Sequence, residues 1–215
     1  MPVFDLHGKR VEFTGDYAGS YDCINKGRFY EFPFLETVRG MALQGIYLDV
    51  GTNVGNHAVY FAMFCEATKV IGFEPMARWR ARALDNIRAN GCEHRVQVFP
   101  DGLLDRPGTL DFNPHGSVYR LDCKTLDILL PEVEGVVFVK MDIEGSEPKA
   151  LLGGKEFFRR NRPVIAAEVL GSTDELAAAA ETIGYRMTGR VFPSTPGSPM
   201  YELLPERSGN PVGLD

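Results

Sequence analysis

Residues 46–75 read IYLDVGTNVGNHAVYFAMFCEATKVIGFEP, and this stretch decides the fold class. Its first part, IYLDVG (46–51), is a short apolar run typical of a buried strand, and NHAVYFAMFCEA (56–67) has apolar side chains at helical spacing. KVIGFEP (69–75) is a second apolar run, which ends at Pro75. Because a helical segment joins the two runs, the stretch predicts two parallel strands connected by a helix.

The same alternation continues towards the end of the chain. Further strands are predicted at residues 95–99, 109–113, 135–142 and 163–169, further helices at 76–91, 125–130, 147–160 and 172–185, and a closing antiparallel pair at 185–192 and 200–205, across the loop 193–199. Strands rich in Val and Ile that alternate with helices are typical of parallel sheets covered on both sides. We therefore expect an α/β fold with a mainly parallel sheet and helices on both of its faces.

The first 45 residues have a different pattern and are predicted to form an extension. VFDLHGKRVEF (3–13) alternates apolar and polar residues around a turn at 7–9, as a β-hairpin does. GRFYEFPFLETVRG (27–40) predicts a short helix. The expected boundaries are an extension over 1–45, a main domain over 46–207 and a C-terminal tail over 208–215.

Composition narrows the classes of partner and compartment. The formal net charge of −6 argues against nucleic-acid binding and against an anionic membrane surface. The one Arg-rich stretch, RWRAR (78–82), falls in a helical pattern and is expected to be a solvated face. We see no secretory leader and no apolar run that would cross a bilayer. The four cysteines are far apart, which favours buried thiols over a zinc site or disulfides. A cytoplasmic protein is expected, and a homo-oligomer remains open.

Acidic residues follow several predicted strands, at the edge where α/β sheets bind ligands. Asp49, Glu74, Asp101 and Asp142 occupy these positions. DVGTNVGN (49–56) is a glycine-containing loop between strand and helix, and by itself it also fits an ordinary turn. It lacks the Gly-Lys-Ser/Thr of a phosphate-binding loop, and asparagines replace the second and third glycines of a dinucleotide-binding loop.

Charge favours a cationic ligand over a pyrophosphate at this edge. Each nearby carboxylate would repel a phosphate by about 4 kcal/mol at 4 Å and a surface-like dielectric. S-adenosylmethionine fits better, because it carries a sulfonium and an ammonium against one carboxylate and has no phosphate. Glu74 is placed to accept hydrogen bonds from its ribose, and capping of the helix at 76–91 is the alternative role for Glu74. We expect S-adenosylhomocysteine as the product.

Five segments resemble the FkbM family of S-adenosylmethionine-dependent methyltransferases. They are LDVGTNVGNHAVYFA, IGFEP, TLDILL, FVKMDIEGSEPKALLGG and PVIAAEV, which together span residues 46–169. The resemblance implies a Rossmann-like class I methyltransferase with a seven-stranded sheet, one strand of which is antiparallel. It also implies O-methylation of a hydroxyl on a sugar, a glycan or a natural product.

The resemblance also implies roles for individual residues. The methionine end of the cofactor would lie against Asp49, Gly51, Thr52, Asn53, Gly55 and Asn56, the ribose against Glu74 and Pro75, and the adenine near Asp101 and Gly102, with Asp142 at the reacting end.

Methyl transfer to a hydroxyl calls for a proton acceptor. Asp142 is the first candidate and Glu144 the second, and crowding of the two would raise the proton affinity of one. Glu147, with Ser146 and Pro148, is predicted to begin a helix instead. His57 and His115 are further candidates, but packing or capping is the favoured role of His57, with a substrate contact as the alternative, and His115 is expected to be a surface loop residue. Glu168 is expected to contact the substrate or to line the pocket. The sequence predicts that the partner of the acidic cluster is a cation from outside the chain.

Three alternatives stay open at this point. Asp142, Glu144 and Glu168 are oxygen ligands that would suit magnesium, although no ligand spacing supports a metal and none is expected. A catalytically silent nucleoside-binding module on the same fold is the second alternative. A dehydrogenase is the third, and the loop and the acidic edge disfavour it.

Overall fold

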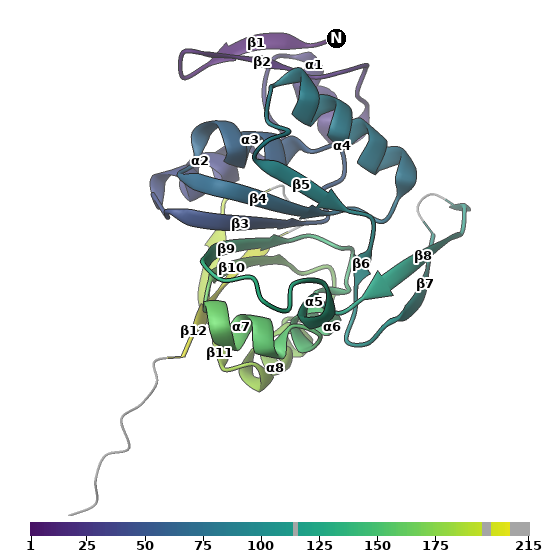
Figure 1. The fold of residues 1–215 in the computed structure, drawn as a ribbon, viewed down its shortest axis with the longest axis vertical. Helices are drawn as coiled ribbons and strands as arrows, with labels where there is room; N and C mark the ends of the chain where they lie inside the picture. The colour runs from purple at the N-terminus through teal and green to yellow at the C-terminus, as the bar shows by residue number, and fades with distance from the viewer. Residues whose placement is uncertain (114–115, 195–198, 207–215) are drawn as a thin grey trace, which may run out of the picture.

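The computed structural model describes residues 1–113, 116–194 and 199–206, and Figure 1 shows a central sheet between two layers of helices. The sheet consists of β3 (Gly45–Val50), β4 (Ala67–Phe73), β5 (Val96–Phe99), β9 (Val136–Met141), β10 (Val164–Glu168), β11 (Tyr185–Phe192) and β12 (Met200–Pro205). Its strand order is β11-β12-β10-β9-β3-β4-β5, and β12 runs antiparallel to both of its neighbours. This confirms the prediction of a mainly parallel, seven-stranded sheet with one antiparallel strand.

Helices cover both faces of the sheet. One face carries α2 (Phe32–Gly40), α3 (Asn56–Phe64) and α4 (Ala77–Ala89), and the other carries α5 (Leu126–Leu129), α6 (Glu147–Leu152), α7 (Lys155–Asn161) and α8 (Thr173–Thr182). Alternate strand residues therefore enter two separate cores. Tyr47 and Phe138 pack with the first group of helices, whereas Leu48 and Val139 pack with the second.

The extension packs on the first face rather than standing apart. It consists of β1 (Val3–Leu6), β2 (Lys9–Glu12), the short 3₁₀ helix η1 (Gly19–Tyr21) and α1 (Asp22–Asn25), followed by α2. The predicted hairpin is confirmed, with His7 and Gly8 at positive φ in its turn. Phe13, Ile24 and Phe29 are buried in the same core as the sheet, so the extension is part of the support for the sheet's edge.

One predicted helix is wrong in its extent. The segment 147–160 forms two helices, because the chain around Gly153 packs against Leu104, which follows β6, and turns a carbonyl towards Asp127 of α5. A Cβ on Gly153 would lie 2.0 Å from the Leu104 carbonyl oxygen, and the carbonyl of Gly153 accepts a hydrogen bond from the amide of Asp127 at 3.1 Å. The helix predicted over 56–67 is shorter than expected, since α3 ends at Phe64 and β4 already begins at Ala67.

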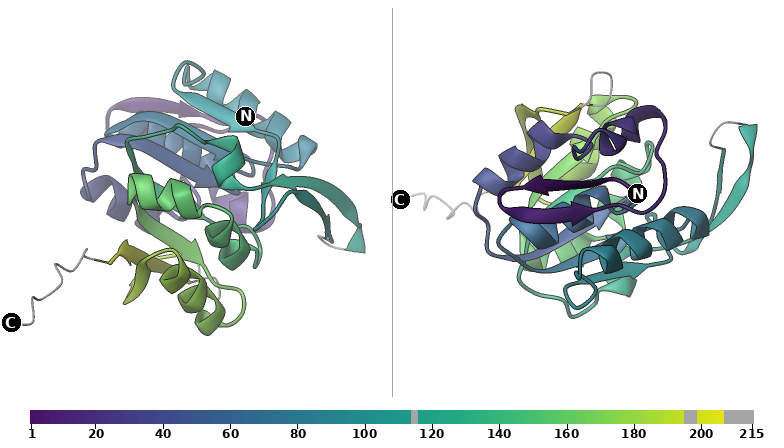
Figure 2. Two further views of the ribbon diagram at one scale, coloured as in Figure 1. Left: turned by 60° about the horizontal axis from the view of Figure 1, so that its bottom comes forward. Right: turned by 90° about the horizontal axis from the view of Figure 1, so that it is seen from above.

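A second, smaller sheet was not predicted. It contains β6 (Gly102–Leu103), β7 (Gly108–Phe112) and β8 (Tyr119–Lys124) in the order β6-β8-β7, of which the sequence indicated only the strand at 109–113. The β7–β8 hairpin, called the arm below, projects from the body in both views of Figure 2. Leu110 faces Leu121 across the arm, so one face of the arm is apolar.

Within the described ranges, no helix has the length and apolar character needed to cross a membrane. His115 lies outside the described residues, and so do the predicted tail at 208–215 and residues 195–198 of the loop at 193–199.

Candidate active site

A cleft of about 580 Å³ opens at the carboxyl edge of the sheet. The chain proceeds from β3 to β4 and β5 in one direction and then returns to β9 and β10 on the other side, so the strand order reverses between β3 and β9. Ligands of open α/β sheets bind at this reversal. The cleft is lined from four parts of the chain: the strand ends, the start of α4, the arm and the extension.

The glycine loop after β3 is held tightly against its neighbours. The amides of Gly51 and Thr52 both donate to the carbonyl of Phe73 at 3.0 Å, and the Thr52 hydroxyl donates to the carbonyl of Asp49 at 2.8 Å. Gly51 has a φ of 81°, and a Cβ there would lie 1.9 Å from the carbonyl oxygen of Asp142. Only glycine meets both conditions, so residue 51 is fixed by the close approach of the two strand ends.

Glu74 is fixed at the end of β4 by two backbone amides. Its Oε2 accepts from the amide of Asn53 and its Oε1 from the amide of Met76, each at 2.8 Å. Met76 immediately precedes α4, so the alternative role at the helix start is present in the structure. Burial is the main cause that raises the pKa of Glu74, and the two amides oppose it. Each carboxylate oxygen can accept a second hydrogen bond, which leaves Glu74 able to contact a diol in the cleft.

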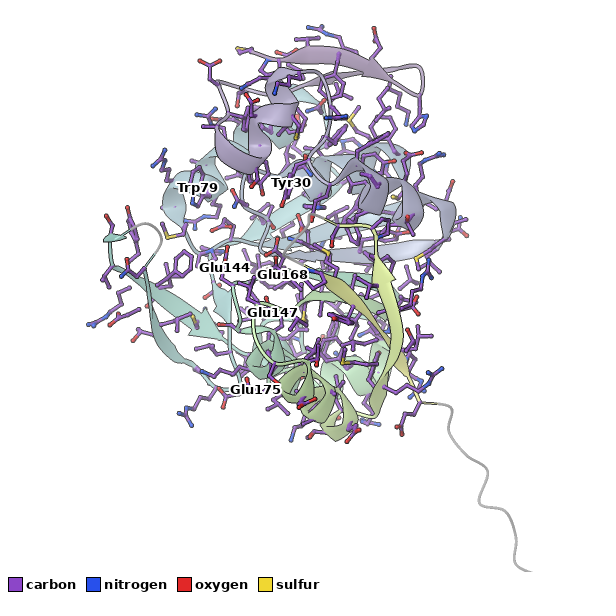
Figure 3. The ribbon with its side chains drawn as sticks, turned by 180° about the vertical axis from the view of Figure 1, so that it is seen from behind. Tyr30, Trp79, Glu144, Glu147, Glu168 and Glu175 are labelled. Atoms are coloured by element: carbon purple, nitrogen blue, oxygen red, sulfur yellow. The ribbon has the colours of Figure 1, made fainter. Side chains whose placement is uncertain are left out.

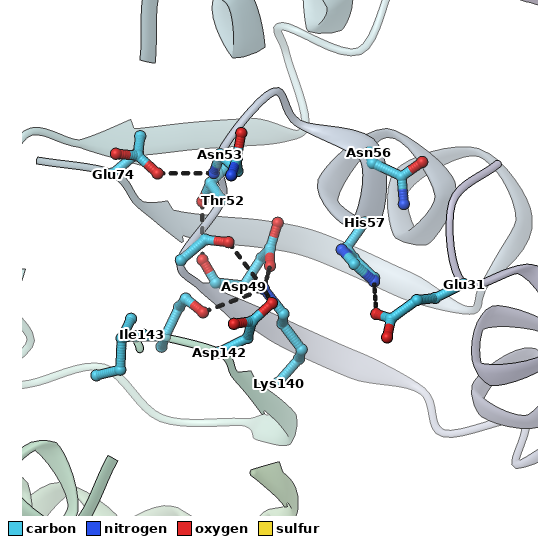
Figure 4. Close-up of polar contacts among 12 residues, drawn as sticks. Glu31, Asp49, Thr52, Asn53, Asn56, His57, Glu74, Lys140, Asp142 and Ile143 are labelled. Atoms are coloured by element: carbon cyan, nitrogen blue, oxygen red, sulfur yellow. Dashed lines mark hydrogen bonds and ion pairs between the residues drawn. The ribbon is translucent and has the colours of Figure 1, made fainter. Parts of the chain in front are cut away.

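Three charged side chains meet between β3 and β9, as Figure 4 shows. The Nζ of Lys140 lies 3.2 Å from Oδ1 of Asp49 and 3.7 Å from Oδ2 of Asp142. It also donates to the carbonyl of Gly51 at 2.8 Å. Lys140 and Asp49 are register partners on adjacent strands, which places their side chains on the same face of the sheet.

Lys140 changes the explanation for the acidic cluster. The sequence predicted that these acids are balanced by a cation from outside the chain, but a buried cation of the chain already lies between two of them. Nearby carboxylates, with Asp49 first, raise the pKa of Lys140 against the opposing effect of burial. Lys140 is therefore an ammonium, and one of the two negative charges beside it remains uncompensated.

Glu147 begins α6, as predicted, with Pro148 in the first turn. Its Oε1 accepts a hydrogen bond from the amide of Ile143 at 2.7 Å, which closes the loop that follows β9. Burial raises the pKa of Glu147 to about 7, and the charge of Asp142 adds to this effect. Glu147 is absent from the residues that line the described part of the cleft, so its role is to shape the loop.

Asn56 and His57 hold the extension against α3 through polar contacts. The side chain of Asn56 exchanges two hydrogen bonds with the backbone of Tyr30, accepting from its amide at 2.9 Å and donating to its carbonyl at 3.0 Å. His57 Nε2 lies 3.1 Å from Oε2 of Glu31. Both side chains are buried. Both side chains fasten the extension to the first turn of α3, and packing is the role that the sequence favours for His57.

The predicted site residues fall into two groups. Those that line the cleft are Gly51, Asn53, Glu74, Pro75, Asp101, Gly102, Asp142, Glu144 and Glu168. Those that lie behind this lining are Asp49, Thr52, Gly55, Asn56 and His57. Gly55, at a φ of 83°, lets α4 approach the loop, since a Cβ there would lie 3.1 Å from Cα of Ala83. The second group supports the loop that the first group presents.

Several lining residues were not predicted. Tyr21 and Tyr30 come from the extension, with their ring centroids 4.7 Å apart. Trp79 comes from α4, and the arm adds Phe112 and Tyr119. Figure 3 shows Tyr30 and Trp79 together with Glu144 and Glu168, all four of which line the cleft. The cleft thus combines aromatic faces with carboxylates.

A second Lys–Asp pair lies beside the cleft at the base of the arm, which is called the outer end of the cleft below. Lys124, at the end of β8, lies 2.9 Å from Asp101. The side chain of Lys124 is 47% exposed and that of Asp101 is 10% exposed. Gly102 packs closely against Cys123 of β8 here, because a Cβ on residue 102 would lie 2.8 Å from Sγ of Cys123.

The residues present suit a cationic nucleoside such as S-adenosylmethionine. The volume is adequate for a ligand of that size. Apart from the Lys140 ammonium, which Asp49 shares with Asp142, the buried oxygens of Asp49 have no partner among the described residues. Glu74 supplies hydrogen-bond acceptors for a diol, and apolar residues of the arm line the outer end of the cleft. Among the described residues, no group of three or more His, Cys, Asp or Glu is arranged to hold a metal ion.

Fold and site together define a Rossmann-like protein of the class I methyltransferase type. A solved structure of the methyltransferase FkbM from Methylobacillus flagellatus KT superposes with a TM-score of 0.60 and 19% identity, covering 75% of this chain and 43% of that one. TrmK of M. capricolum, solved with S-adenosylhomocysteine, gives a TM-score of 0.52 and 11% identity, covering 83% of this chain and 70% of that one. At these identities the likeness concerns the fold.

The family follows from the sequence comparison. Residues 49–187, more than half of the chain, match the model of the methyltransferase FkbM domain, and the chain belongs to this family. A curated relative is the 2-O-methyltransferase NoeI of Sinorhizobium fredii (strain NBRC 101917 / NGR234), at 26% identity over 54% of this chain. The chain spans about 60% of the length of that relative.

Proposed function

We propose that this chain transfers a methyl group from S-adenosylmethionine to a hydroxyl of a sugar, a glycan or a natural product. The observation that carries the proposal is the cleft at the reversal of strand order, where Glu74, Asp142 and Glu144 line one wall. Membership of the FkbM family and the similarity to a 2-O-methyltransferase support it.

When bound, the cofactor would supply an electrophilic methyl group on its sulfonium. The chain supplies position and charge. Glu74 is held by the amides of Asn53 and Met76, so its carboxylate has a fixed direction for the ribose hydroxyls. Asp101 and Gly102 line the outer end, where the adenine is expected.

Asp142 is the proposed proton acceptor. It stands at the end of β9 with its side chain one-quarter exposed, so it is open to the cleft while its far side faces Lys140. Glu144 is more exposed and has a φ of 57°, which turns the loop outwards at that point. This geometry favours Asp142 for the proton and Glu144 for a contact with the acceptor. Glu168, buried at the end of β10, is a second proposed acceptor contact.

The proposed acceptor is small or oligomeric and carries hydroxyl groups. Aromatic side chains such as Tyr30 and Trp79 provide faces for a sugar ring, and carboxylates provide hydrogen-bond acceptors for its hydroxyls. A net charge of −6 disfavours nucleic acid as the acceptor.

The test combines binding and turnover. Calorimetry with S-adenosylmethionine, S-adenosylhomocysteine and NAD should show binding of the first two and not of the third. Transfer of labelled methyl groups is then measured against a panel of glycosides, oligosaccharides and hydroxylated natural products. We expect Asp142→Asn to lower kcat by about 100-fold or more. We expect Glu144→Gln to raise KM for the acceptor and to change kcat by less.

Glu175→Gln is the matched control, because Glu175 is an exposed carboxylate on α8, outside the residues that line the described part of the cleft. Wild-type rates for both Asp142→Asn and Glu144→Gln would show that the base lies elsewhere. Cofactor binding without transfer to any acceptor would favour the silent nucleoside-binding module. Loss of activity in EDTA, restored by magnesium, would show that a metal takes part.

A further inference from the structure

Lys140 is a buried lysine near the end of the central strand β9. Burying its charge has a free-energy cost that the fold alone does not require. The side chain is 1% exposed and that of Asp49 is 0% exposed. Removing both charges from water costs several kcal/mol, which their attraction offsets only with good geometry. An apolar pair at these two positions would pack a parallel sheet equally well. The pair therefore calls for an explanation in the chemistry of the cleft.

The charges around Lys140 do not cancel. Its ammonium lies between the carboxylates of Asp49 and Asp142, so these three groups, called the triad below, carry one uncompensated negative charge. Of the triad, only Asp142 lines the cleft, and its side chain is one-quarter exposed. Glu31 also raises the pKa of Lys140, but its carboxylate lies against His57 and is absent from the residues that line the described part of the cleft. The uncompensated charge is thus presented to a ligand through Asp142.

We propose that Lys140 keeps the reacting end of the cleft electrically balanced both before and after methyl transfer, and thereby sets its preference for the cofactor over its product. This inference rests on the proposed function. S-adenosylmethionine has one more positive charge than S-adenosylhomocysteine, at the sulfur. Before transfer, that charge matches the single uncompensated negative charge of the triad.

The balance also holds after the reaction. The bond from the methyl carbon to sulfur breaks and its electron pair stays on sulfur, a bond from carbon to the acceptor oxygen forms, and the acceptor's proton passes to Asp142. Protonated Asp142 is neutral, so Lys140 and Asp49 then cancel beside an uncharged thioether. Without Lys140, two negative charges would hold the sulfonium too strongly in the ground state, and such binding opposes its loss in the transition state.

The test measures the ratio of two dissociation constants, for S-adenosylhomocysteine and for S-adenosylmethionine, by calorimetry. The ammonium and carboxylate of the amino-acid part are common to both ligands, so the ratio reports the sulfur charge. Lys140→Met adds one uncompensated negative charge, and we expect the ratio to rise about tenfold. Asp49→Asn removes the uncompensated charge, and we expect the ratio to fall about tenfold.

The double variant Lys140→Met/Asp49→Asn restores a single negative charge, so its ratio should return to within about threefold of the wild-type value. Lys124→Met is the matched control: it makes the same substitution beside Asp101 at the outer end, and the ratio should stay at the wild-type value. If Lys140→Met does not fold, Asp49→Asn and the double variant still decide the question.

A wild-type ratio in Asp49→Asn, or an unrestored ratio in the double variant, would overturn the role of Lys140. Absence of binding of both ligands to the wild-type protein would instead overturn the proposed function. The two failures are therefore distinguishable without knowledge of the acceptor.

Discussion

One Lys–Asp pair lies behind the lining at the inner end of the cleft, between β3 and β9, and a second lies at the outer end, at the base of the arm. The two pairs differ far more in burial than in distance. At the inner end Lys140 and Asp49 are 3.2 Å apart, and both are almost fully buried. At the outer end Lys124 and Asp101 are closer, at 2.9 Å, but nearly half of the Lys124 side chain is exposed. Because water screens an exposed pair, the shorter contact is the weaker one. The distance between the charges alone therefore does not determine which of the two Lys–Asp pairs is stronger.

The surroundings of the two lysines explain how each end behaves. Lys140 stands on a central strand and also donates to the carbonyls of Val50 and Gly51, so it joins β9 to the glycine loop. Lys124 stands on the small sheet, at the base of a projecting arm. We infer that the inner end is built to stay fixed, whereas the outer end can adjust to the ligand.

The largest difference between the ends should appear in stability. Lys140→Met leaves the carboxylate of Asp49 buried and uncompensated, which should lower the free energy of unfolding by about 3–5 kcal/mol. Lys124→Met removes an exposed pair and should cost less than about 1 kcal/mol. Urea denaturation of both variants against the wild type measures these costs. Equal losses of unfolding free energy in the two variants would show that burial does not determine how much each pair stabilises the fold.

A second difference concerns the response to pH. Glu147 lies beneath the inner end with a pKa raised to about 7, mainly by burial, whereas a glutamate in the unfolded chain titrates near 4.5. The folded protein therefore keeps this proton over a range where the unfolded chain loses it. As the pH rises from about 4.5 to 7, the free energy of unfolding should fall by about 3 kcal/mol because of this group.

Glu147→Gln removes the titration and still offers an oxygen to the amide of Ile143. The stability difference between wild type and this variant should therefore change by about 2 kcal/mol between pH 5 and pH 7.5. The exposed Glu175→Gln serves as the control and should show a constant difference. A constant difference for Glu147→Gln as well would mean that the carboxyl group is ionised in the folded protein at both pH values.

The fold was predictable because each of its signals is local. The apolar runs at 46–51, 69–75 and 135–142, and the helices between them, need only their own spacing to be recognised. The break at Gly153 was missed because it depends on a contact with Leu104, far away in the chain. The strand at 119–124 was missed because it pairs with β7 through a hairpin whose residues have weak strand patterns.

The site was predictable where residues follow a strand and not where they arrive from elsewhere. Glu74, Asp101 and Asp142 stand at strand ends, which meet at one edge by topology alone. In the sequence, Lys140 is a single charged residue within an apolar strand. Only the register with β3 shows that its side chain meets Asp49. Nothing in the spacing of Tyr30 indicates that the extension lines the cleft.

The smallest expected difference concerns the contacts that hold the extension and the arm in place. The extension is tied to the inner end by Asn56, whose buried side chain exchanges two hydrogen bonds with Tyr30. The arm at the outer end is bridged by Asp111 and Arg120, both largely exposed, at 2.9 Å. Asn56→Ala leaves backbone groups of Tyr30 without these partners and should cost about 2 kcal/mol. Arg120→Ala breaks only an exposed ion pair, and the urea midpoint should stay almost unchanged.

Urea titrations followed by circular dichroism and by the fluorescence of Trp79, the only tryptophan in the chain, separate the two effects. Trp79 packs against the same small apolar cluster as Leu110 and Phe112 of the arm, so its emission reports the outer end. For Asn56→Ala both signals should shift together to lower urea, because the extension shares its core with the sheet. A larger loss in Arg120→Ala than in Asn56→Ala would mean that exposed contacts, and not buried ones, hold the walls of the cleft in place.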